Sequence, residues 1–223
     1  YQRNQALLME TPPSLPEAFT PDVATARAIL ARALAEGRRR LDEAEALQLL
    51  SAYGLPVIDT WLAQSPDEAA AIAAERDGPL VLKILAPEVA HPALLGGMAS
   101  VLSTPDAVRQ AATERLARLR EVAPAARCRG FILQPMTARD GAYELTLGVR
   151  SGGRFGPVIY FGQGGPDAVA IDDLAYGLPP LNLHLAREIM AQTRIYQRLR
   201  YSLLRRANLN ALALALVKIS QMV

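Results

Sequence analysis

The sequence predicts an α+β (mixed α/β) protein built from two lobes. Segments with helical and strand-like patterns alternate in the first half of the chain, three strand-like segments then follow one another after residue 130, and helical patterns close the chain. A doubly wound parallel fold would alternate strands and helices regularly throughout its length, and this order does not. We therefore expect two mixed lobes divided near residue 130.

The first 50 residues predict an arm followed by two helices. Residues 1–20 include TPPSLP, which cannot continue a helix, and we interpret them as a linker or arm. Apolar residues then recur at helical spacing until Gly37. A second helix is expected to open at Asp42, with Glu45 completing a capping box three residues later, and to end at Gly54.

The next segments alternate strand and helix. PVIDTWL predicts a short strand, and SPDEAAAIAAERDG predicts a helix that Ser65 caps and Gly78 ends. PLVLKIL predicts a buried strand that contains Lys83. After HPALLGG, MASVL is a further strand candidate, and a clear helix begins at Ser103 or Thr104.

The second half predicts three strands in succession, GFILQPM, YELTLGVRS and GPVIYFG. Two long helices, at about 183–200 and 208–223, follow them. We therefore expect an N-terminal lobe with its leading helices over 21–130 and a C-terminal lobe over 131–223.

Composition limits the classes of function. The 24 basic residues nearly balance the 22 acidic ones, which argues against a nucleic-acid partner because such proteins carry a clear basic surplus. The single cysteine, Cys128, excludes an intrachain disulfide and fits a cytoplasmic location. The longest apolar run, 211–217, is far shorter than the roughly 20 residues that span a bilayer. Because the chain begins at Tyr1 and stops inside a helical pattern, we expect it to be a piece of a longer polypeptide. We expect no membrane partner for these residues.

The first candidate site lies in LVLKILAPEVAHPALLGGM. Lys83 closes an apolar run, where an ammonium group can neutralise a phosphate or simply extend from the strand into solvent. His91 can act as a nucleophile near neutral pH, or it can be a turn residue without a role. Gly96 and Gly97 allow the backbone to approach an anion closely, and they equally suit an ordinary turn.

A second glycine group, FGPVIYFGQGG, offers backbone amides at Gly162, Gly164 and Gly165 that can face a phosphate. No Lys-Ser or Lys-Thr pair follows, so the segment is not a P-loop. Pro166 and Asp167 stand where the dinucleotide-binding pattern would open a helix, so that pattern is excluded as well.

Taken together and in order, these segments carry a resemblance. LDEAEALQLLSAYGLPV, GPLVLKILAPEVAHPALLGG, GFILQPM, YELTLGV, FGPVIYFGQGG and DDLAYGLPPLNLHLAREIMAQTR resemble the nucleotide-binding segment of the NDP-forming acyl-CoA synthetases. These proteins include ADP-forming acetate–CoA ligase and are relatives of succinyl-CoA synthetase. The resemblance runs from about Leu41 to about Leu199. It implies a two-lobed ATP-grasp fold.

The resemblance also implies ligands, partners and a reaction. The ligands would be ATP or ADP with Mg²⁺. The partner would be the acyl-binding CoA-ligase part, in the same polypeptide or another subunit, and a homo-oligomer is compatible with it. The reaction would convert acyl-CoA, phosphate and ADP into acid, CoA and ATP through phosphohistidines. YQRNQALLMETPPS further resembles the junction in fused members, some of which carry a lysine acetyltransferase domain of the GNAT type.

The resemblance assigns roles to particular residues. Lys83 would contact the nucleotide phosphates and His91 would accept the phosphoryl group. The positions implied beside the nucleotide are the hinge residues Gln134, Pro135 and Met136, the acidic residue Glu144, the mobile-loop glycines Gly96 and Gly97, and the second glycine loop with Gly162, Gly164 and Gly165. The metal candidates within this chain are Asp172 and Asp173.

Two departures from the family pattern keep alternatives open. Pro92 stands where relatives usually have a lysine, and Ala93 and Leu94 replace a Ser-Asp pair. The family's acidic-Ile-Asn-Pro-Leu motif, which supplies magnesium ligands, has no match within the 223 residues, so we expect the isolated chain to be inactive. The alternative to a catalytic domain is a degenerate ATP-grasp module that regulates, or senses nucleotide for, a fused lysine acetyltransferase. A plain scaffold domain without nucleotide affinity is the third reading.

Overall fold

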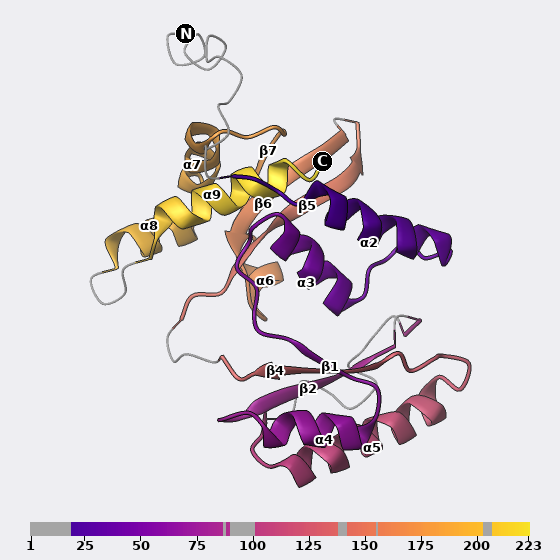
Figure 1. Cartoon of the computed structure of the whole chain (residues 1–223). Coiled ribbons are helices and arrows are strands. Elements are labelled where there is room, and N and C mark those ends of the chain that lie inside the picture. The colour runs from indigo at the N-terminus through magenta and orange to yellow at the C-terminus, as the bar shows by residue number, and fades with distance from the viewer. Residues whose placement is uncertain (1–18, 87, 90–100, 138–141, 155, 203–206) are drawn as a thin grey trace, which may run out of the picture. The chain divides into compact units, whose positions relative to one another are not determined.

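The computed structural model describes residues 19–86, 88–89, 101–137, 142–154, 156–202 and 207–223. These residues divide between two compact units (Figure 1). We call the unit made from 22–52 and 56–137 the N-unit, and the unit made from 19–21, 53–55 and 142–223 the C-unit. Each unit joins helices to an antiparallel sheet, which confirms the mixed α+β class.

The N-unit contains a four-stranded antiparallel sheet with the strand order β1-β4-β2-β3. Its elements, in chain order, are α2 (Val23–Ala35), α3 (Glu43–Ala52), β1 (Trp61–Ala63), α4 (Pro66–Ala74), β2 (Leu80–Leu85), β3 (Val101–Leu102), α5 (Pro105–Val122) and β4 (Gly130–Pro135). In the central pair, Lys83 of β2 lies opposite Ile132 of β4, and Val81 lies opposite Gln134. This register places residues from two distant segments next to each other.

The two faces of the N-unit sheet pack differently. Leu80 and Leu82 of β2 lie in the apolar cluster that α4 and α5 form on one face (Figure 1). On the other face, Leu85 and Ile132 pack against Ala44 at the start of α3. Because alternate residues of a strand point to opposite faces, Lys83 shares the α3 face with Leu85.

Side-chain caps define where the N-unit helices begin, as the sequence predicts. Asp42 Oδ1 accepts a hydrogen bond from the Glu45 amide, and Glu45 Oε2 accepts one from the Asp42 amide, both at 2.9 Å. This reciprocal pair is a capping box. Ser65 accepts from the Glu68 amide at the start of α4, and Thr104 caps α5 in the same way.

Glu45 also anchors a buried ionic network. Glu45 is only 4% exposed, and Arg38 donates to both of its carboxylate oxygens at 2.7 Å. Arg129, just before β4, lies 3.0 Å from Asp42 Oδ2 through Nη1. The hydrogen bond from Arg38 is the main reason that the pKa of Glu45 falls to about 2. The network therefore ties the α2–α3 connection to the chain leading into β4.

The C-unit is built on a three-stranded antiparallel sheet with the order β5-β6-β7. Its elements are β5 (Leu145–Gly153), β6 (Gly156–Gln163), α6 (Ala168–Ile171), β7 (Leu174–Gly177), α7 (Leu183–Ala191), α8 (Arg194–Tyr201) and α9 (Leu209–Ser220). The sequence did not predict α6 or β7.

The prediction of one helix over 183–200 is wrong, because the structure has two helices there, α7 and α8. Thr193 separates α7 from α8. Its hydroxyl donates to the Met190 carbonyl at 2.8 Å and accepts from the Tyr196 amide at 3.3 Å. A threonine that bonds to nearby backbone in this way competes with helical hydrogen bonds, and the chain turns there.

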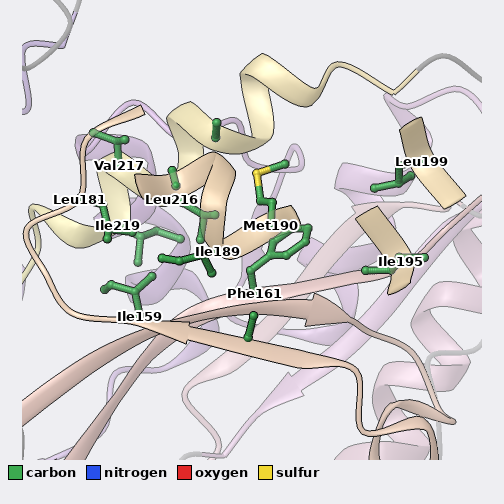
Figure 2. Close-up of a cluster of buried hydrophobic side chains, with 13 residues drawn as sticks. Ile159, Phe161, Leu181, Ile189, Met190, Ile195, Leu199, Leu216, Val217 and Ile219 are labelled. Carbon is green, nitrogen blue, oxygen red and sulfur yellow. The ribbon is translucent and has the colours of Figure 1, made fainter. Parts of the chain in front are cut away.

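The core of the C-unit lies between its sheet and its last three helices. Figure 2 shows Ile159 and Phe161 of β6 directed toward side chains of α7 and α9. The fully or almost fully buried members that Figure 2 labels are Ile159, Phe161, Leu181, Ile189, Met190, Ile195, Leu199, Leu216, Val217 and Ile219. Burial of this much apolar surface is the main stabilising contribution to the unit.

The boundary between the units differs from the predicted division near residue 130. β4 pairs with both β1 and β2, so it belongs to the N-unit sheet. The short segment 53–55 belongs to the C-unit, where Lys218 donates to the Gly54 carbonyl. Of the predicted arm 1–20, only residues 19–20 fall within the described ranges. No helix in those ranges is long and apolar enough to cross a membrane.

Glu45→Gln is expected to lower the free energy of unfolding by about 2 kcal/mol at pH 7, because it removes the charge that Arg38 binds. The folded pKa of Glu45, about 2, lies below its ordinary value of 4.5. Its contribution is therefore complete above pH 4.5 and is lost as the pH falls toward 2. Urea denaturation at several pH values should show the difference from wild type shrinking below pH 4.5.

Glu36→Gln is the matched control for this change. Glu36 also contacts Arg38 but its side chain is 44% exposed, so the loss should stay below about 1 kcal/mol. Equal losses for the two variants, or a pH-independent effect of Glu45→Gln, would contradict the assignment of the network to Glu45.

Candidate functional site

Lys83 lies on a face of the N-unit sheet rather than at the end of a strand. It is the fourth of the six residues of β2, and Ile84 and Leu85 continue the strand beyond it, so the expectation that it closes the apolar run is wrong. The Lys83 side chain remains 40% exposed, so a ligand can reach its ammonium group.

Three side chains from three elements, one of them Lys83, form a closed ring of hydrogen bonds. Lys83 Nζ donates to Glu43 Oε1 at 2.6 Å and to Gln134 Oε1 at 3.1 Å. Gln134 Nε2 donates to the same Glu43 oxygen at 3.2 Å and to Thr60 Oγ1 at 3.1 Å. Gln134 is 5% exposed, so its amide sits inside the unit with all of these partners. We call Lys83, Glu43 and Gln134 the lysine ring.

The three predicted hinge residues have different surroundings. Gln134 and Pro135 are the last residues of β4, and the side chain of Gln134 belongs to the lysine ring. The backbone amide of Met136 donates to the Pro79 carbonyl at 2.9 Å, and the Met136 side chain is 39% exposed. The structure thus joins Gln134 to Lys83, although the resemblance gave these two residues separate roles.

Sequence reasoning missed Glu43 and Thr60. Glu43 is the first residue of α3, where acidic side chains are common because they favour the helix dipole. Its separation of 40 positions from Lys83 carries no local signal. The capping box at Asp42 was the only indication, since it places the Glu43 side chain at a defined point.

His91, Gly96 and Gly97 lie outside the described residues. Their roles as phosphate acceptor and mobile loop stay predictions.

In the C-unit, the structure brings Glu144 together with the second glycine loop. The Gly164 amide donates to the Glu144 carbonyl at 2.8 Å. A Cβ atom on Gly165 would lie 3.0 Å from Glu144 Oε2, and Gly165 has a φ angle of +87°. The exposed Glu144 side chain therefore lies beside the turn that follows β6.

Packing accounts for two of these glycines. A Cβ atom on Gly162 would lie 1.9 Å from the carbonyl oxygen of Asp173, the residue before β7. A Cβ atom on Gly164 would lie 2.9 Å from the Leu145 backbone. Side chains at these positions are excluded by the neighbouring backbone whether or not a phosphate binds there. Their contact with phosphate stays a prediction.

The two metal candidates have unequal freedom. Asp173 is 6% exposed, and its two carboxylate oxygens accept the backbone amides of Arg194 and Ile195 at 2.8 and 2.7 Å. These amides begin α8, so Asp173 caps that helix, where a negative charge is favourable. Asp172 is exposed and has a φ angle of +48°.

A metal site does not assemble within the described ranges, which contain no group of three His, Cys, Asp or Glu side chains placed to hold an ion. Both carboxylate oxygens of Asp173 already serve α8. Without a nucleotide, the protein would have to supply most of the oxygen ligands that Mg²⁺ or Ca²⁺ requires. Asp172 and Asp173 therefore do not fit the metal by themselves.

A model of the ATP-grasp domain matches residues 32–223. The chain belongs to the ATP-grasp family, and the predicted ATP-grasp fold is confirmed.

Among characterised relatives, acetate–CoA ligase (ADP-forming) I of Archaeoglobus fulgidus is 34% identical over 167 residues. The match covers 75% of this chain and 24% of that ligase, so the chain spans about a quarter of its length. The β subunit of acetate–CoA ligase (ADP-forming) II of Pyrococcus furiosus is 30% identical, with 75% of this chain and 70% of the subunit covered. The predicted likeness to ADP-forming acid–CoA ligases is confirmed.

Solved structures agree. An acetyl-coenzyme A synthetase 1 of Ca. Korarchaeum cryptofilum, in complex with coenzyme A and Ca-AMPCP, superimposes with a TM-score of 0.79 at 30% identity. The match covers 88% of this chain and 86% of that one. A protein of Pyrococcus horikoshii superimposes with a TM-score of 0.82 at 28% identity, over 89% of this chain and 83% of that one.

Asp173→Asn is expected to lower the free energy of unfolding by about 1–2 kcal/mol, because it weakens the cap of α8. Asp172→Asn is the matched control and should cost less than about 0.5 kcal/mol, since asparagine tolerates a left-handed backbone at an exposed position. Urea denaturation measures both. Equal losses would show that the α8 cap is not the main role of Asp173.

Proposed function

We propose that this chain is the nucleotide-binding part of an ADP-forming acyl-CoA synthetase. The full protein would interconvert acyl-CoA, phosphate and ADP with a carboxylic acid, CoA and ATP. Lys83 carries the proposal: its ammonium group is held on the sheet face with 40% of the side chain exposed, in a chain whose relatives are ADP-forming ligases. Such a point charge suits phosphate oxygens.

The chain's own composition supports a specific role for this lysine. Only two of its 24 basic residues are lysines, Lys83 and Lys218. Guanidinium groups serve nearly everywhere else, including the ionic network around Glu45. An ammonium is compact and donates in three directions, whereas a guanidinium is a wide planar fork. The lysine ring, with two acceptors close to one nitrogen, suits the ammonium.

The proposed partner is the CoA-binding part of the synthetase. The relatives are either longer single chains or β subunits by name, and coenzyme A is present in the Korarchaeum complex. In the N-unit we assign nucleotide contacts to the Lys83 face and the hinge at 134–136. The second glycine loop of the C-unit is a separate candidate for contact with phosphate. The acyl group and CoA would bind the partner domains, in the same polypeptide or another subunit.

His91 is the proposed phosphate carrier between the two parts. One Korarchaeum structure contains a phosphorylated phosphohistidine segment, and another has that segment pointing towards the nucleotide binding site. In the direction of ATP synthesis, a β-phosphate oxygen of ADP attacks the phosphorus and the P–N bond breaks. The other ring nitrogen of the phosphohistidine carries a proton, so the imidazole leaves as the neutral group. The chain would thereby return to its starting state.

Magnesium is proposed to arrive with the nucleotide, whose phosphates it commonly shares with only one or two carboxylates. Glu144 and Asp172 are the exposed carboxylates among the proposed site residues. Asp173 is not assigned to the ion because α8 uses both of its oxygens.

The second candidate function is a nucleotide-sensing module without phosphoryl transfer, attached to a lysine acetyltransferase. The sequence HPALLGG favours it, because Pro92 removes a cation next to His91. It shares the nucleotide site with the first proposal and differs from it only in the chemistry at His91.

Lys83→Met is expected to weaken ADP binding by about 10- to 100-fold, the loss of one charge-assisted contact. Isothermal titration of the full-length protein with ADP, with and without Mg²⁺, measures this. Lys218→Met changes the other lysine, which donates to the Gly54 carbonyl, and should leave ADP affinity unchanged. No affinity for ADP in the wild type would sink both proposed functions and leave the scaffold reading.

Incubation of the full-length protein with γ-labelled ATP is expected to leave acid-labile label on the wild type and none on His91→Asn. Phosphohistidine is acid-labile, whereas phosphoserine is not, so acid lability excludes phosphoserine. Loss of the label in His91→Asn then ties it to His91. Label of equal strength on the variant would refute the carrier role. ADP binding without any label would select the sensing module.

A further inference from the structure

We infer that Glu43 and Gln134 are positioning residues that set Lys83 in place for a nucleotide phosphate. This inference rests on the proposed function of Lys83. It adds Glu43, which was not among the predicted site residues, and it gives the side chain of Gln134 a role in placing the lysine that contacts phosphate. Their observed contacts with the ammonium group carry it.

The hydrogen-bond stoichiometry leaves the ammonium ready for a ligand. An ammonium group has three N–H donors. Glu43 Oε1 and Gln134 Oε1 accept two of them, at 2.6 and 3.1 Å. In the part of the chain that the structure describes, no third acceptor contacts Lys83 Nζ, and the side chain is 40% exposed. One donor is therefore available to a phosphate oxygen.

Gln134 supplies one of the two acceptors and holds the other, Glu43, in place. Its amide nitrogen donates to Glu43 Oε1 and to Thr60 Oγ1, so its amide oxygen must face Lys83. The reverse orientation would place an N–H group against an ammonium. Because Gln134 is buried in β4 opposite Val81, the ring is attached to the centre of the N-unit sheet.

Glu43 is held from the other side by the helix that it begins. It follows Asp42, whose capping box with Glu45 defines the first turn of α3. Glu45 in turn is buried against Arg38. The Glu43 carboxylate is therefore on a rigid element, although its side chain is 39% exposed.

Ordering the lysine before a ligand arrives is the physical benefit. A lysine side chain has four rotatable bonds, and fixing them on binding subtracts from affinity. The lysine ring orders the Lys83 side chain during folding, so less conformational entropy is lost when the phosphate binds. The Glu43 charge opposes an incoming phosphate, but both side chains are about 40% exposed, so water and salt screen that repulsion. We expect positioning to be the larger effect.

A double-mutant cycle on the full-length protein tests this, with ADP titration as the readout. Glu43→Ala is expected to weaken ADP binding by about threefold to tenfold when Lys83 is present. It should change nothing in the Lys83→Met background. Glu43→Gln, whose amide oxygen can still accept from Lys83, should recover most of the affinity. Adenosine, which has no phosphate, should bind equally to Glu43→Ala and wild type.

Glu68→Ala is the matched control, because Glu68 also lies in the first turn of a helix and caps a backbone amide; its ADP affinity should equal that of wild type. Thermal melts verify folding, and Thr60→Val, which removes one partner of Gln134, is the second variant if Glu43→Ala does not fold. It should weaken ADP binding in the same Lys83-dependent way.

The outcomes separate the two levels of inference. If Lys83→Met leaves ADP affinity unchanged, the proposed function is wrong. If Lys83→Met weakens binding but Glu43→Ala does not, or if Glu43→Ala weakens it equally in both backgrounds, only the positioning role is wrong. Tighter ADP binding by Glu43→Ala would also overturn it, since repulsion would then outweigh positioning.

Discussion

The N-unit site depends on the hydrogen bonds that the buried Glu45 carboxylate makes with Arg38 and Asp42. This carboxylate closes the capping box with Asp42, accepts two hydrogen bonds from Arg38, and so determines where α3 begins. A helix that begins elsewhere would move Glu43 away from Lys83. An ionised group with 4% exposure is tolerated only because its charge is paired and hydrogen-bonded. The ionic network therefore serves the site indirectly, through the geometry of one helical turn.

In the C-unit, residues predicted to bind metal or phosphate also have structural roles. Asp173 caps α8, and its carbonyl occupies the space that a side chain at Gly162 would need. Gly164 is required by the Leu145 backbone. These constraints pack β6, β7 and α8 closely together. A glycine loop can serve packing and phosphate binding at once, because both require backbone that approaches a neighbour without a Cβ atom between them.

Arg38 and Lys83 show how a guanidinium and an ammonium group serve different purposes in this chain. Arg38 binds both oxygens of Glu45, the bidentate geometry that a planar guanidinium suits. Lys83 instead contacts single oxygens of two different side chains. This arrangement leaves a donor over, whereas the Arg38 fork is directed at a partner inside the unit. The same charge thus serves structure in one place and an accessible site in the other.

Local patterns in the sequence determined the helix starts at Asp42, Ser65 and Thr104, because a cap and its helix lie within four residues of each other. The order of the motifs also indicated the ATP-grasp family and selected Lys83. Tertiary structure alone decided the pairing of β4 with β1 and β2 and the meeting of Glu43, Lys83 and Gln134. Those contacts join segments 40 to 91 positions apart. Strand pairing and helix docking bring such segments together, and neither leaves a periodic signal at the residues that meet.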